Sequence, residues 1–475
     1  METIKRKPQS VYKQTVIAYL LLLYFLLIPF YIFPSGLPQI ADFLLLMIFF
    51  LLVLSQRSIQ LGPVTRSTIG LFIAFILITI IVNGIWAIRL NDAWVLESAS
   101  YYVYNSVIVL TFIIAKSLFG AKLYPLIMNA AAASLILQAL LLVPMYGTGD
   151  GARETLFFNN PNQLGYYALV SLAIVLLINE TGRRKKGAFF FLALISGSIV
   201  IMASLSKAAI FAAVLLFFGY GVLQLNKLAR KNSLKMLALF SSFAIFLGIF
   251  MLTDTLDGYA FFDDLSLRLE STGGTEDDNL SGRGYDRIFN HPEYALIGAG
   301  EGDITGRITS DYTGELHSTI GTVLFSYGVI GFVLFSGLLL KGVVAAAPAH
   351  LFALLPVLFY GLTHNGLRSG LFWILLTLLI VLKDDAVIER RKKRDQTENL
   401  RHLHREKRRN DDRSYAHEPN VTDFPAVGAD RDRRRINRPY PGHYPELSAD
   451  GTADPRFLYR RYRPRRSAQP RRSAR

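Results

Sequence analysis

The residues of this sequence best suited to chemistry are cations and imidazoles at the edges of apolar runs. Lys207 lies at the junction of two such runs, and His317 lies where an acidic segment leads into the next run. The other candidates are Arg268, Arg283 and Arg287 in the acidic segment, His364 and Arg368 before the last run, and Asp42, an acid inside a run. Charges in or beside a membrane are costly unless they face water or a partner. If the fold gathers these side chains, they form a basic pocket suited to a diphosphate, which arginine binds through paired hydrogen bonds.

Each candidate also has a purely structural interpretation. Arg268, Arg287 and Arg307 could pair with the many carboxylates of their own segment. Lys207 could anchor a helix end by extending its ammonium group towards the headgroups. His317, His364 and Arg368 could be ordinary interface residues, and Asp42 could hydrogen-bond a neighbouring helix.

Motifs for other chemistries are missing or lack their context. The sequence has no Walker A lysine motif, no HExxH and no GxSxG, and it contains no cysteine for a thiolate-ligated metal. Gly298-Ala299-Gly300-Glu301-Gly302 has neither the spacing nor the strand–helix context of a dinucleotide site. Acidic runs such as Glu276-Asp277-Asp278 could hold a divalent cation, but in external loops they are more often simply solvated. We therefore expect no metal and no cofactor.

The elements that must position the candidates are membrane helices. Of the 475 residues, 52% are hydrophobic and 18% charged, whereas soluble proteins carry about 25% charged residues. A membrane-spanning helix needs about 20 mostly apolar residues. Twelve runs fit: 15–33, 38–54, 68–86, 100–118, 124–143, 161–178, 188–205, 208–225, 237–253, 318–340, 343–361 and 369–382. The sequence thus predicts an all-α polytopic membrane protein, with a tight turn at Ser206-Lys207.

Basic residues in the short loops predict the orientation. With the N-terminus in the cytoplasm, the inner segments before residue 383 hold 17 basic residues and the outer segments hold eight. Eighteen acids lie outside and only two, Glu2 and Glu180, lie inside. Both termini are then cytoplasmic, and Lys207, His317 and His364 lie at the outer face.

The sequence predicts a membrane domain over 1–382 and a cytoplasmic tail over 383–475. One large external loop, 254–316, interrupts the membrane domain and carries a net charge of −10. The tail carries +11 and has few aliphatic residues, which predicts disorder apart from a short charged helix near 386–409. Anionic membrane lipids or a docking protein suit this tail better than nucleic acid, because no nucleic-acid recognition motif accompanies the charge.

Four motifs resemble the O-antigen ligase and polymerase superfamily of bacterial surface-polysaccharide assembly. The first is Phe158-Asn159-Asn160-Pro161-Asn162-Gln163-Leu164-Gly165, similar to the family's Asn-rich helix start. The second is Ser206-Lys207, where the family usually has Ser-Arg-Gly. The third runs from Gly282-Arg283 with Tyr285 through His291-Pro292 to Ile297–Gly302, and the fourth is His317-Ser318 followed by Tyr327-Gly328 and Ile330-Gly331. Their order and spacing carry the resemblance, from about the fifth apolar run to the twelfth.

The resemblance implies a GT-C-like glycosyltransferase fold and a metal-independent enzyme of the bacterial inner membrane. Its substrate would be a polyprenyl-diphosphate-linked glycan at the periplasmic or extracellular face, and polysaccharide-assembly proteins could dock through the tail. The diphosphate-binding basic positions carry over to Lys207 and Arg283, and the essential histidine to His317. Lysine replaces the usual arginine at 207, which loses the bidentate fork, and serine replaces the asparagine after His317.

The resemblance implies substrate binding by Asn162, and the residues themselves suggest the same for Arg268, Arg287, His364, Arg368 and Asp42. Polymerisation of repeat units is the preferred activity, because nothing in the sequence marks a surface for docking a lipid acceptor. Ligation of finished glycan to a lipid or protein is one alternative. Transport of a lipid-linked glycan is another, although transporters favour charged or broken helices at mid-membrane.

Overall fold

The computed structural model describes residues 8–33, 37–56, 58–145, 153–182, 187–228, 281–302, 307–310, 312, 314–343 and 350–415. The chain divides into two units, 1–401 and 402–475. The described residues of the second unit are helical and include an exposed His402–Glu406 pair at 3.5 Å. All other described residues belong to the first unit.

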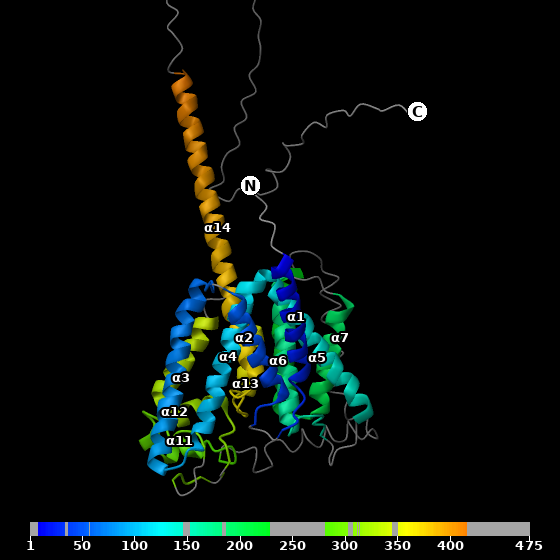
Figure 1. The fold of residues 1–475 in the computed structure, drawn as a ribbon, viewed down its shortest axis with the longest axis vertical. Coiled ribbons are helices and arrows are strands. Elements are labelled where there is room, and N and C mark those ends of the chain that lie inside the picture. Colours follow the sequence, from blue (N-terminus) through cyan, green and yellow to red (C-terminus); the bar gives the residue numbers. More distant parts are fainter. Residues whose placement is uncertain are drawn as a thin grey trace, which may run out of the picture. The chain divides into compact units, whose positions relative to one another are not determined.

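Every regular element of the described residues is a helix (Figure 1). The long helices are α1 (Pro8–Leu27), α2 (Ile40–Ser55), α3 (Pro63–Leu90), α4 (Val95–Phe119), α5 (Leu123–Met145), α6 (Pro161–Glu180), α7 (Ala188–Ala203), α8 (Lys207–Leu228), α12 (Thr319–Val343), α13 (Leu351–Tyr360) and α14 (Gly370–Tyr415). Short turns of helix are η1 (Gly120–Lys122), α11 (Asp286–Asn290) and η4 (Pro292–Tyr294). The predicted tight turn is confirmed, because only residues 204–206 separate α7 from α8.

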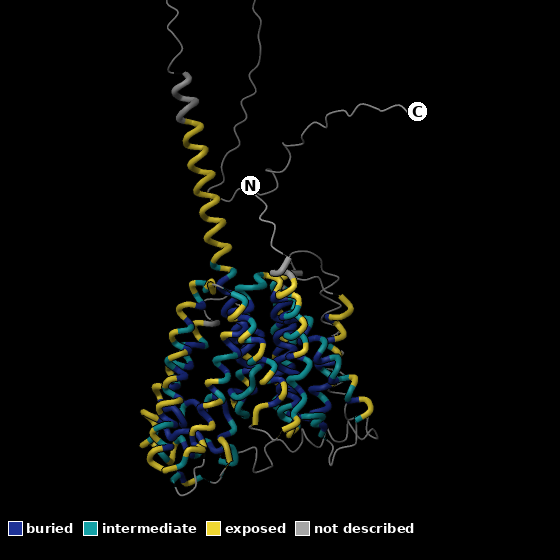
Figure 2. The backbone as a smooth tube through the Cα atoms, in the orientation of Figure 1, coloured by how far each residue is buried: buried dark blue, intermediate teal, exposed yellow. Residues whose placement is uncertain are grey.

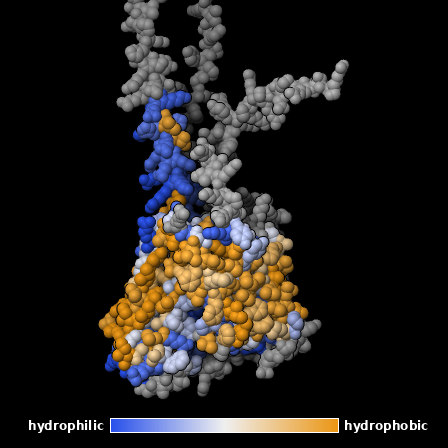
Figure 3. All heavy atoms as spheres, in the orientation of Figure 1, coloured by the Kyte–Doolittle hydropathy of each residue, from blue (hydrophilic) through white to orange (hydrophobic). Residues whose placement is uncertain are grey.

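The protein is an all-α membrane protein. Five helical stretches are long and apolar enough to cross a bilayer, namely 63–90, 95–145, 161–180, 207–225 and 319–341. The stretch 95–145 comprises α4 and α5, between which the chain reverses at η1. On the face shown in Figure 3, apolar side chains cover the middle of the helices and hydrophilic ones gather towards their ends.

Of the twelve apolar runs, eleven overlap helices of the described residues, the run 343–361 only at Leu351–Tyr360, and the run 237–253 lies outside the described residues. The shorter apolar helices are Tyr12–Leu27, Ile40–Ser55, Ala188–Ala203 and Leu351–Tyr360. Twelve membrane spans therefore remain a prediction.

Two helices form the centre of the bundle. In α6, every residue from Leu164 to Glu180 is buried, and the first third of α14 is buried almost as completely around Trp373 (Figure 2). The other helices surround them: α3 packs against α4 and α12, α2 against α1 and α4, α5 against α1, α6 and α7, and α8 against α6 and α13. Exposed Leu, Ile and Phe side chains lie on the outward faces, as expected where lipid is the solvent.

Two adjacent acids of α14 hold several helix ends together. Asp384 accepts hydrogen bonds from the backbone N–H groups of Val64 (2.7 Å) and Thr65 (3.0 Å), and from the Thr65 hydroxyl. It therefore caps the N-terminus of α3, where four N–H groups have no partner within the helix. Asp385 accepts from Lys116 Nζ and from the Tyr124 hydroxyl, both at 2.8 Å, which joins α14 to α4 and α5.

The predicted boundary at residue 382 falls inside α14, which is continuous from Gly370 to Tyr415. The short charged helix expected near 386–409 is thus an extension of the last apolar helix, and its side chains are exposed from about residue 388 to 408. Residues 416–475 and most of the predicted external loop, including Arg268, lie outside the described residues.

We predict that Asp384→Ala destabilises the protein by about 1–3 kcal/mol, because it leaves two N–H groups of α3 without their acceptor. The matched control is Asp395→Ala, which removes an exposed acid from the same helix. Thermal unfolding in detergent should show a clearly lower midpoint for the first variant only. Equal midpoints would contradict the capping role.

Candidate functional site

The candidate residues lie at one end of the bundle, where α3 ends and α12 begins (Figure 1). We call this the site end. The described loops at this end are 28–33, 37–39, 91–94, 153–160, 204–206, 281–302, 314–318 and 361–369. Asp384 and Asp385 lie at the opposite end. Successive helices run in opposite directions, as the apolar runs predict, and the loops that carry the candidate residues therefore lie at the same end.

Main-chain and hydroxyl bonds hold His317 at the start of α12. The His317 N–H donates to the carbonyl of Arg283 at 3.1 Å. The next residue, Ser318, caps α12, because its Oγ accepts from the N–H of Gly321 at 2.9 Å. The hydroxyl of Tyr285 donates to the same Oγ at 2.7 Å. The serine after His317 thus has a local structural role.

A second set of bonds ties this helix start to the loop after α13. The N–H of Thr319 donates to the carbonyl of Gly361 at 2.6 Å, and its hydroxyl donates to the carbonyl of His364 at 3.2 Å. The same hydroxyl accepts from the N–H of Gly366 at 2.9 Å. The loop that carries His364 is therefore fixed against the segment that carries His317.

Five rings form a continuous file across the site end. Tyr166 stacks on Tyr360 with centroids 4.6 Å apart, and Tyr360 stacks on His364 at 4.7 Å. His364 faces His317 at 6.4 Å, and His317 packs on Tyr312 at 4.9 Å. The hydroxyl of Tyr312 also lies 2.9 Å from Nε2 of His317. The file joins α6, α13 and two loops that are distant in the sequence.

Arg153 joins the start of α6 to the turn before α8. Its Nη2 donates to Oδ1 of Asn162 at 2.8 Å, and its Nε donates to the carbonyl of Ser204 at 3.2 Å. The carbonyl of Asn162 in turn accepts from the hydroxyl of Tyr360 at 2.9 Å. Lys207, three residues after Ser204, begins α8 at the same turn.

The Asn-rich stretch before α6 is explained by local helix chemistry. Asn160 is the N-cap, and its Oδ1 accepts from the N–H of Gln163 at 2.9 Å. Pro161 follows at the first helical position, where its missing N–H costs nothing. This geometry presents the Asn162 side chain to Arg153.

Burial, together with nearby positive charge, keeps His364 neutral. Burial lowers the pKa of His364 to about 3, and the charges of Arg283, His317 and Arg153 contribute in the same direction. Nη1 of Arg283 donates to the carbonyl of Thr363 at 2.7 Å, which places this arginine beside the ring. His364 is therefore neutral at neutral pH.

Arg287 has a structural role in the described contacts. It is only 3% exposed, and its Nη2 donates to the carbonyls of Tyr312 and of Gly314, the latter at 2.8 Å. Burial lowers its pKa, against the opposing effect of Asp286. Arg287 thus fixes the segment that carries Tyr312, and most carboxylates of the predicted loop, with which it could pair, lie outside the described residues.

Arg368 binds two carboxylates. It contacts Glu315 at 2.5 Å and Glu301 at 3.2 Å, and its guanidinium lies over the Tyr101 ring at 4.6 Å. Burial alone would lower the pKa of Arg368, but Glu301 and Glu315 outweigh it and raise the pKa. Its charge is therefore balanced within the protein.

Asp42 acts as a helix cap. Its Oδ2 accepts from the N–H of Gln39 at 2.7 Å, and its Oδ1 accepts from the hydroxyl of Tyr104 at 2.6 Å. The bond to Gln39 is part of a capping box at the start of α2, and the bond to Tyr104 ties α2 to α4. The expected hydrogen bond to another helix is confirmed, and substrate binding by Asp42 stays a prediction.

The sequence interpretation missed Arg153, Tyr312, Tyr360 and Glu301. Glu301 is 7% exposed and accepts hydrogen bonds from the hydroxyls of Tyr102 (2.5 Å) and Tyr327 (2.8 Å). Arg153 is a charged residue between two apolar runs, so its charge was a usable signal. Tyr312 and Tyr360 gave no signal in the sequence, because only the fold brings them next to His317 and His364.

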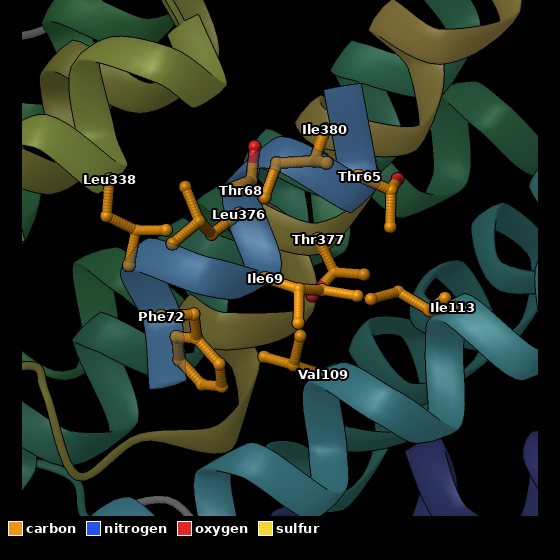
Figure 4. A pocket seen from close by; sticks show the side chains of 10 residues that line it. All are labelled: Thr65, Thr68, Ile69, Phe72, Val109, Ile113, Leu338, Leu376, Thr377 and Ile380. Carbon is orange, nitrogen blue, oxygen red and sulfur yellow. The ribbon is translucent and has the colours of Figure 1, made fainter. Parts of the chain in front are cut away.

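The described residues contain no group of three or more His, Asp or Glu side chains arranged to hold a metal ion. One pocket lies between α3, α4, α12 and α14, and Figure 4 shows its lining, which includes Phe72, Val109 and Leu376. Its lining is apolar apart from three threonines, and Thr65 places it towards the opposite end. It has no part in the candidate site.

No known protein-family model and no curated protein sequence matches this chain.

We predict that His364→Gln reduces the loss of stability on acidification. In the unfolded chain histidine titrates near pH 6.5, whereas the folded pKa of His364 is about 3. As the pH falls from about 7.5 to about 5, the unfolded state gains a proton that the folded state does not, so folding becomes less favourable. The unfolding temperature should therefore drop less in the variant than in the wild type.

The control is His404→Gln, which removes an exposed histidine from α14. It should follow the wild-type pH dependence. If the unfolding temperature fell equally with pH in the wild type and in His364→Gln, protonation of His364 would not be the cause of the pH dependence.

Proposed function

We propose that this protein transfers a glycosyl group from a polyprenyl-diphosphate-linked oligosaccharide and thereby polymerises the repeat units of a bacterial surface polysaccharide. The supporting observation is the cluster at the site end. Arg283 donates to the carbonyl of Thr363, next to the buried His364, and Arg153 donates to Asn162, whose carbonyl binds the tyrosine stacked on the same imidazole. A diphosphate at that place would meet positive charge in surroundings of low polarity, where each charge pair is strengthened. The motifs shared with the O-antigen ligase and polymerase superfamily favour the same substrate.

The reaction follows from these roles. The acceptor hydroxyl oxygen forms a bond to the anomeric carbon, the bond from that carbon to the diphosphate oxygen breaks, and the lipid diphosphate leaves with the electron pair. The hydroxyl proton passes to His317 or to the departing diphosphate. Arg283 and Lys207 stabilise the charge that grows on the diphosphate, a contribution that is often the largest in catalysis. His364 serves as a neutral hydrogen-bonding ring.

Tyr312 is the positioning residue for His317 in this proposal. It contacts the imidazole both through its ring and through its hydroxyl, and Arg287 fixes its main chain. This support sets the orientation of His317, and the hydroxyl can donate to Nε2 or accept from it, whichever tautomer is present.

The position of the buried charges favours transfer over transport. In the described part of the chain, the buried charged residues are Glu154, Glu180, Arg287, Glu301, Lys383 and Asp384. All of them lie in loops or in the last turns of the apolar parts of helices. Transporters instead place charged residues at mid-membrane, and this difference in charge favours transfer even though α12 is itself broken at Gly328.

The direct test uses the purified protein with a synthetic polyprenyl-diphosphate oligosaccharide. A ladder of products means polymerisation, and a single transfer to an added lipid or protein acceptor means ligation. Binding without release of the lipid diphosphate would support transport. A substrate that is neither bound nor changed would contradict the proposal.

We predict that Arg283→Ala, Lys207→Ala and His317→Ala each lower the turnover number by about 10²–10³-fold, the usual cost of losing one stabiliser of a developing charge. The control is Arg89→Ala, an exposed arginine at the same end that lies over Trp86 at 5.2 Å. It should stay close to the wild type. Full polymer synthesis by all three variants in a deletion strain would refute the assignment.

We also predict that Tyr312→Phe lowers the turnover number and shifts its pH profile while leaving KM nearly unchanged. The variant keeps the ring on His317 and loses only the hydroxyl at Nε2. The control is Tyr294→Phe. Tyr294 also belongs to the predicted external loop, but its ring packs on Trp86 and Phe325. An unaltered pH profile for Tyr312→Phe would leave Tyr312 with no positioning role.

A further inference from the structure

We propose that residues 295–300, which the sequence assigns to an external loop, are embedded in the edge of the bilayer, with lipid chains covering Leu296 and Ile297. The segment follows α11 and η4 and contains the glycine-rich motif to which no function has yet been given. The inference does not depend on the proposed function.

The depth of the segment follows from its partners. The N–H groups of Ala299 and Gly300 donate to the carbonyls of Phe325 and Ser326, both at 2.9 Å. Ser326 lies seven residues inside α12, which at 1.5 Å per residue is about 10 Å below the helix start. The apolar stretch 319–341 is only slightly longer than a bilayer core of about 30 Å requires, so this position lies below the membrane surface.

The neighbour on the other side of the segment, α3, indicates the same depth. The N–H of Glu301 donates to Oδ1 of Asn83 at 3.0 Å. Asn83 lies seven residues before the end of α3 at Leu90, again about 10 Å along the helix axis. The segment is therefore wedged between α3 and α12 within the bundle.

A kink in α12 leaves backbone groups of this helix available to bond with the segment, as non-helical backbone inside a membrane requires. Gly328 has non-helical backbone angles (φ 64°, ψ −171°), which frees the carbonyls of Phe325 and Ser326 from their usual bonds within the helix. The N–H of Val329 correspondingly turns to the carbonyl of Ala295 at 2.8 Å. Non-helical backbone is tolerated at membrane depth only where protein groups satisfy it, and here they do.

Two glycines allow this close approach. A Cβ at Gly298 would lie 2.2 Å from the carbonyl oxygen of Ser326, and one at Gly328 would lie 2.3 Å from that of Leu296. Both residues also have positive φ, which side chains disfavour. The glycine-rich motif is thus a packing device that lets two backbones touch.

The outward side of the segment is apolar and exposed. Leu296 is 64% exposed and Ile297 is 55% exposed. Their backbones contact α12 next to Val329 and Ile330, which are exposed as well, and Val333 follows one turn further at 60%. The exposed surface of the segment therefore continues the lipid-facing surface of a membrane helix, which argues for lipid as the partner.

Aromatic residues mark the membrane boundary just before the segment. Tyr294 packs edge-on against Trp86, and the guanidinium of Arg307 lies over the same indole at 4.4 Å. Trp, Tyr and Arg side chains typically gather at the level of the headgroups. The indole N–H of Trp86 also donates to the carbonyl of Gly298 at 3.2 Å, so the segment lies at this level, and the proposal puts the exposed Glu293 on its water side.

The absence of cysteine from the sequence makes the test direct, because single cysteines can be introduced without removing others. Leu296→Cys, Ile297→Cys, Glu293→Cys and Val333→Cys would each carry a nitroxide spin label in proteoliposomes. Power saturation then measures access to oxygen, which concentrates in lipid, and to a water-soluble nickel chelate. All four sites are exposed, so the labels should leave the fold intact, which unfolding temperatures would verify.

We expect the oxygen-to-nickel accessibility ratio at 296 and 297 to match that of the membrane helix site 333 and to exceed that at 293 several-fold. A ratio at 296 and 297 equal to that at 293 would place the segment in water and overturn the proposal. Low access to both reagents would show that protein, rather than lipid, covers the segment, and would overturn it equally.

Discussion

A polar group inside a bilayer has no water to bind, so it must find its partner within the protein. The backbone groups of the helices meet this requirement by themselves, but helix ends and side chains do not. The structure meets it with a small number of buried or half-buried carboxylates that each serve several donors. Asp384 caps α3, Asp385 binds Lys116 and Tyr124, and Glu301 accepts from two tyrosines and Arg368.

The same requirement explains why the polar chemistry collects at helix ends. The centre of the bundle is packed by the buried faces of α6 and α14, and the pocket between α3, α4, α12 and α14 is lined mainly by apolar side chains. At the site end the loops bond to one another through hydroxyls and main-chain groups, which holds His317 and His364 in a file of rings. A rigid, weakly hydrated place with positive charge at its edge is what a bound diphosphate requires.

Not all cations at the site end are equivalent. Arg368 is balanced by two glutamates and Arg287 is buried against carbonyls, so both stabilise loops. Arg283 and Arg153 also bond to loops, at the carbonyl of Thr363 and at Asn162, and these bonds place both close to His364. A net charge for the loop cannot distinguish these cases, because the distinction depends on which partner each guanidinium meets.

The sequence by itself determined the helical, membrane-embedded class and the positions of eleven helices, because the cost of exposing polar residues to lipid is local and can be read from each run alone. It also indicated Lys207, Arg283 and His317, whose motifs are short and contiguous. The tertiary structure decided everything that joins distant segments: Arg153 at Asn162, Tyr312 at His317, and the glycine-rich stretch folded against the kink in α12. These contacts arise from packing between elements far apart in the chain, and no local pattern of residues encodes which of them will meet.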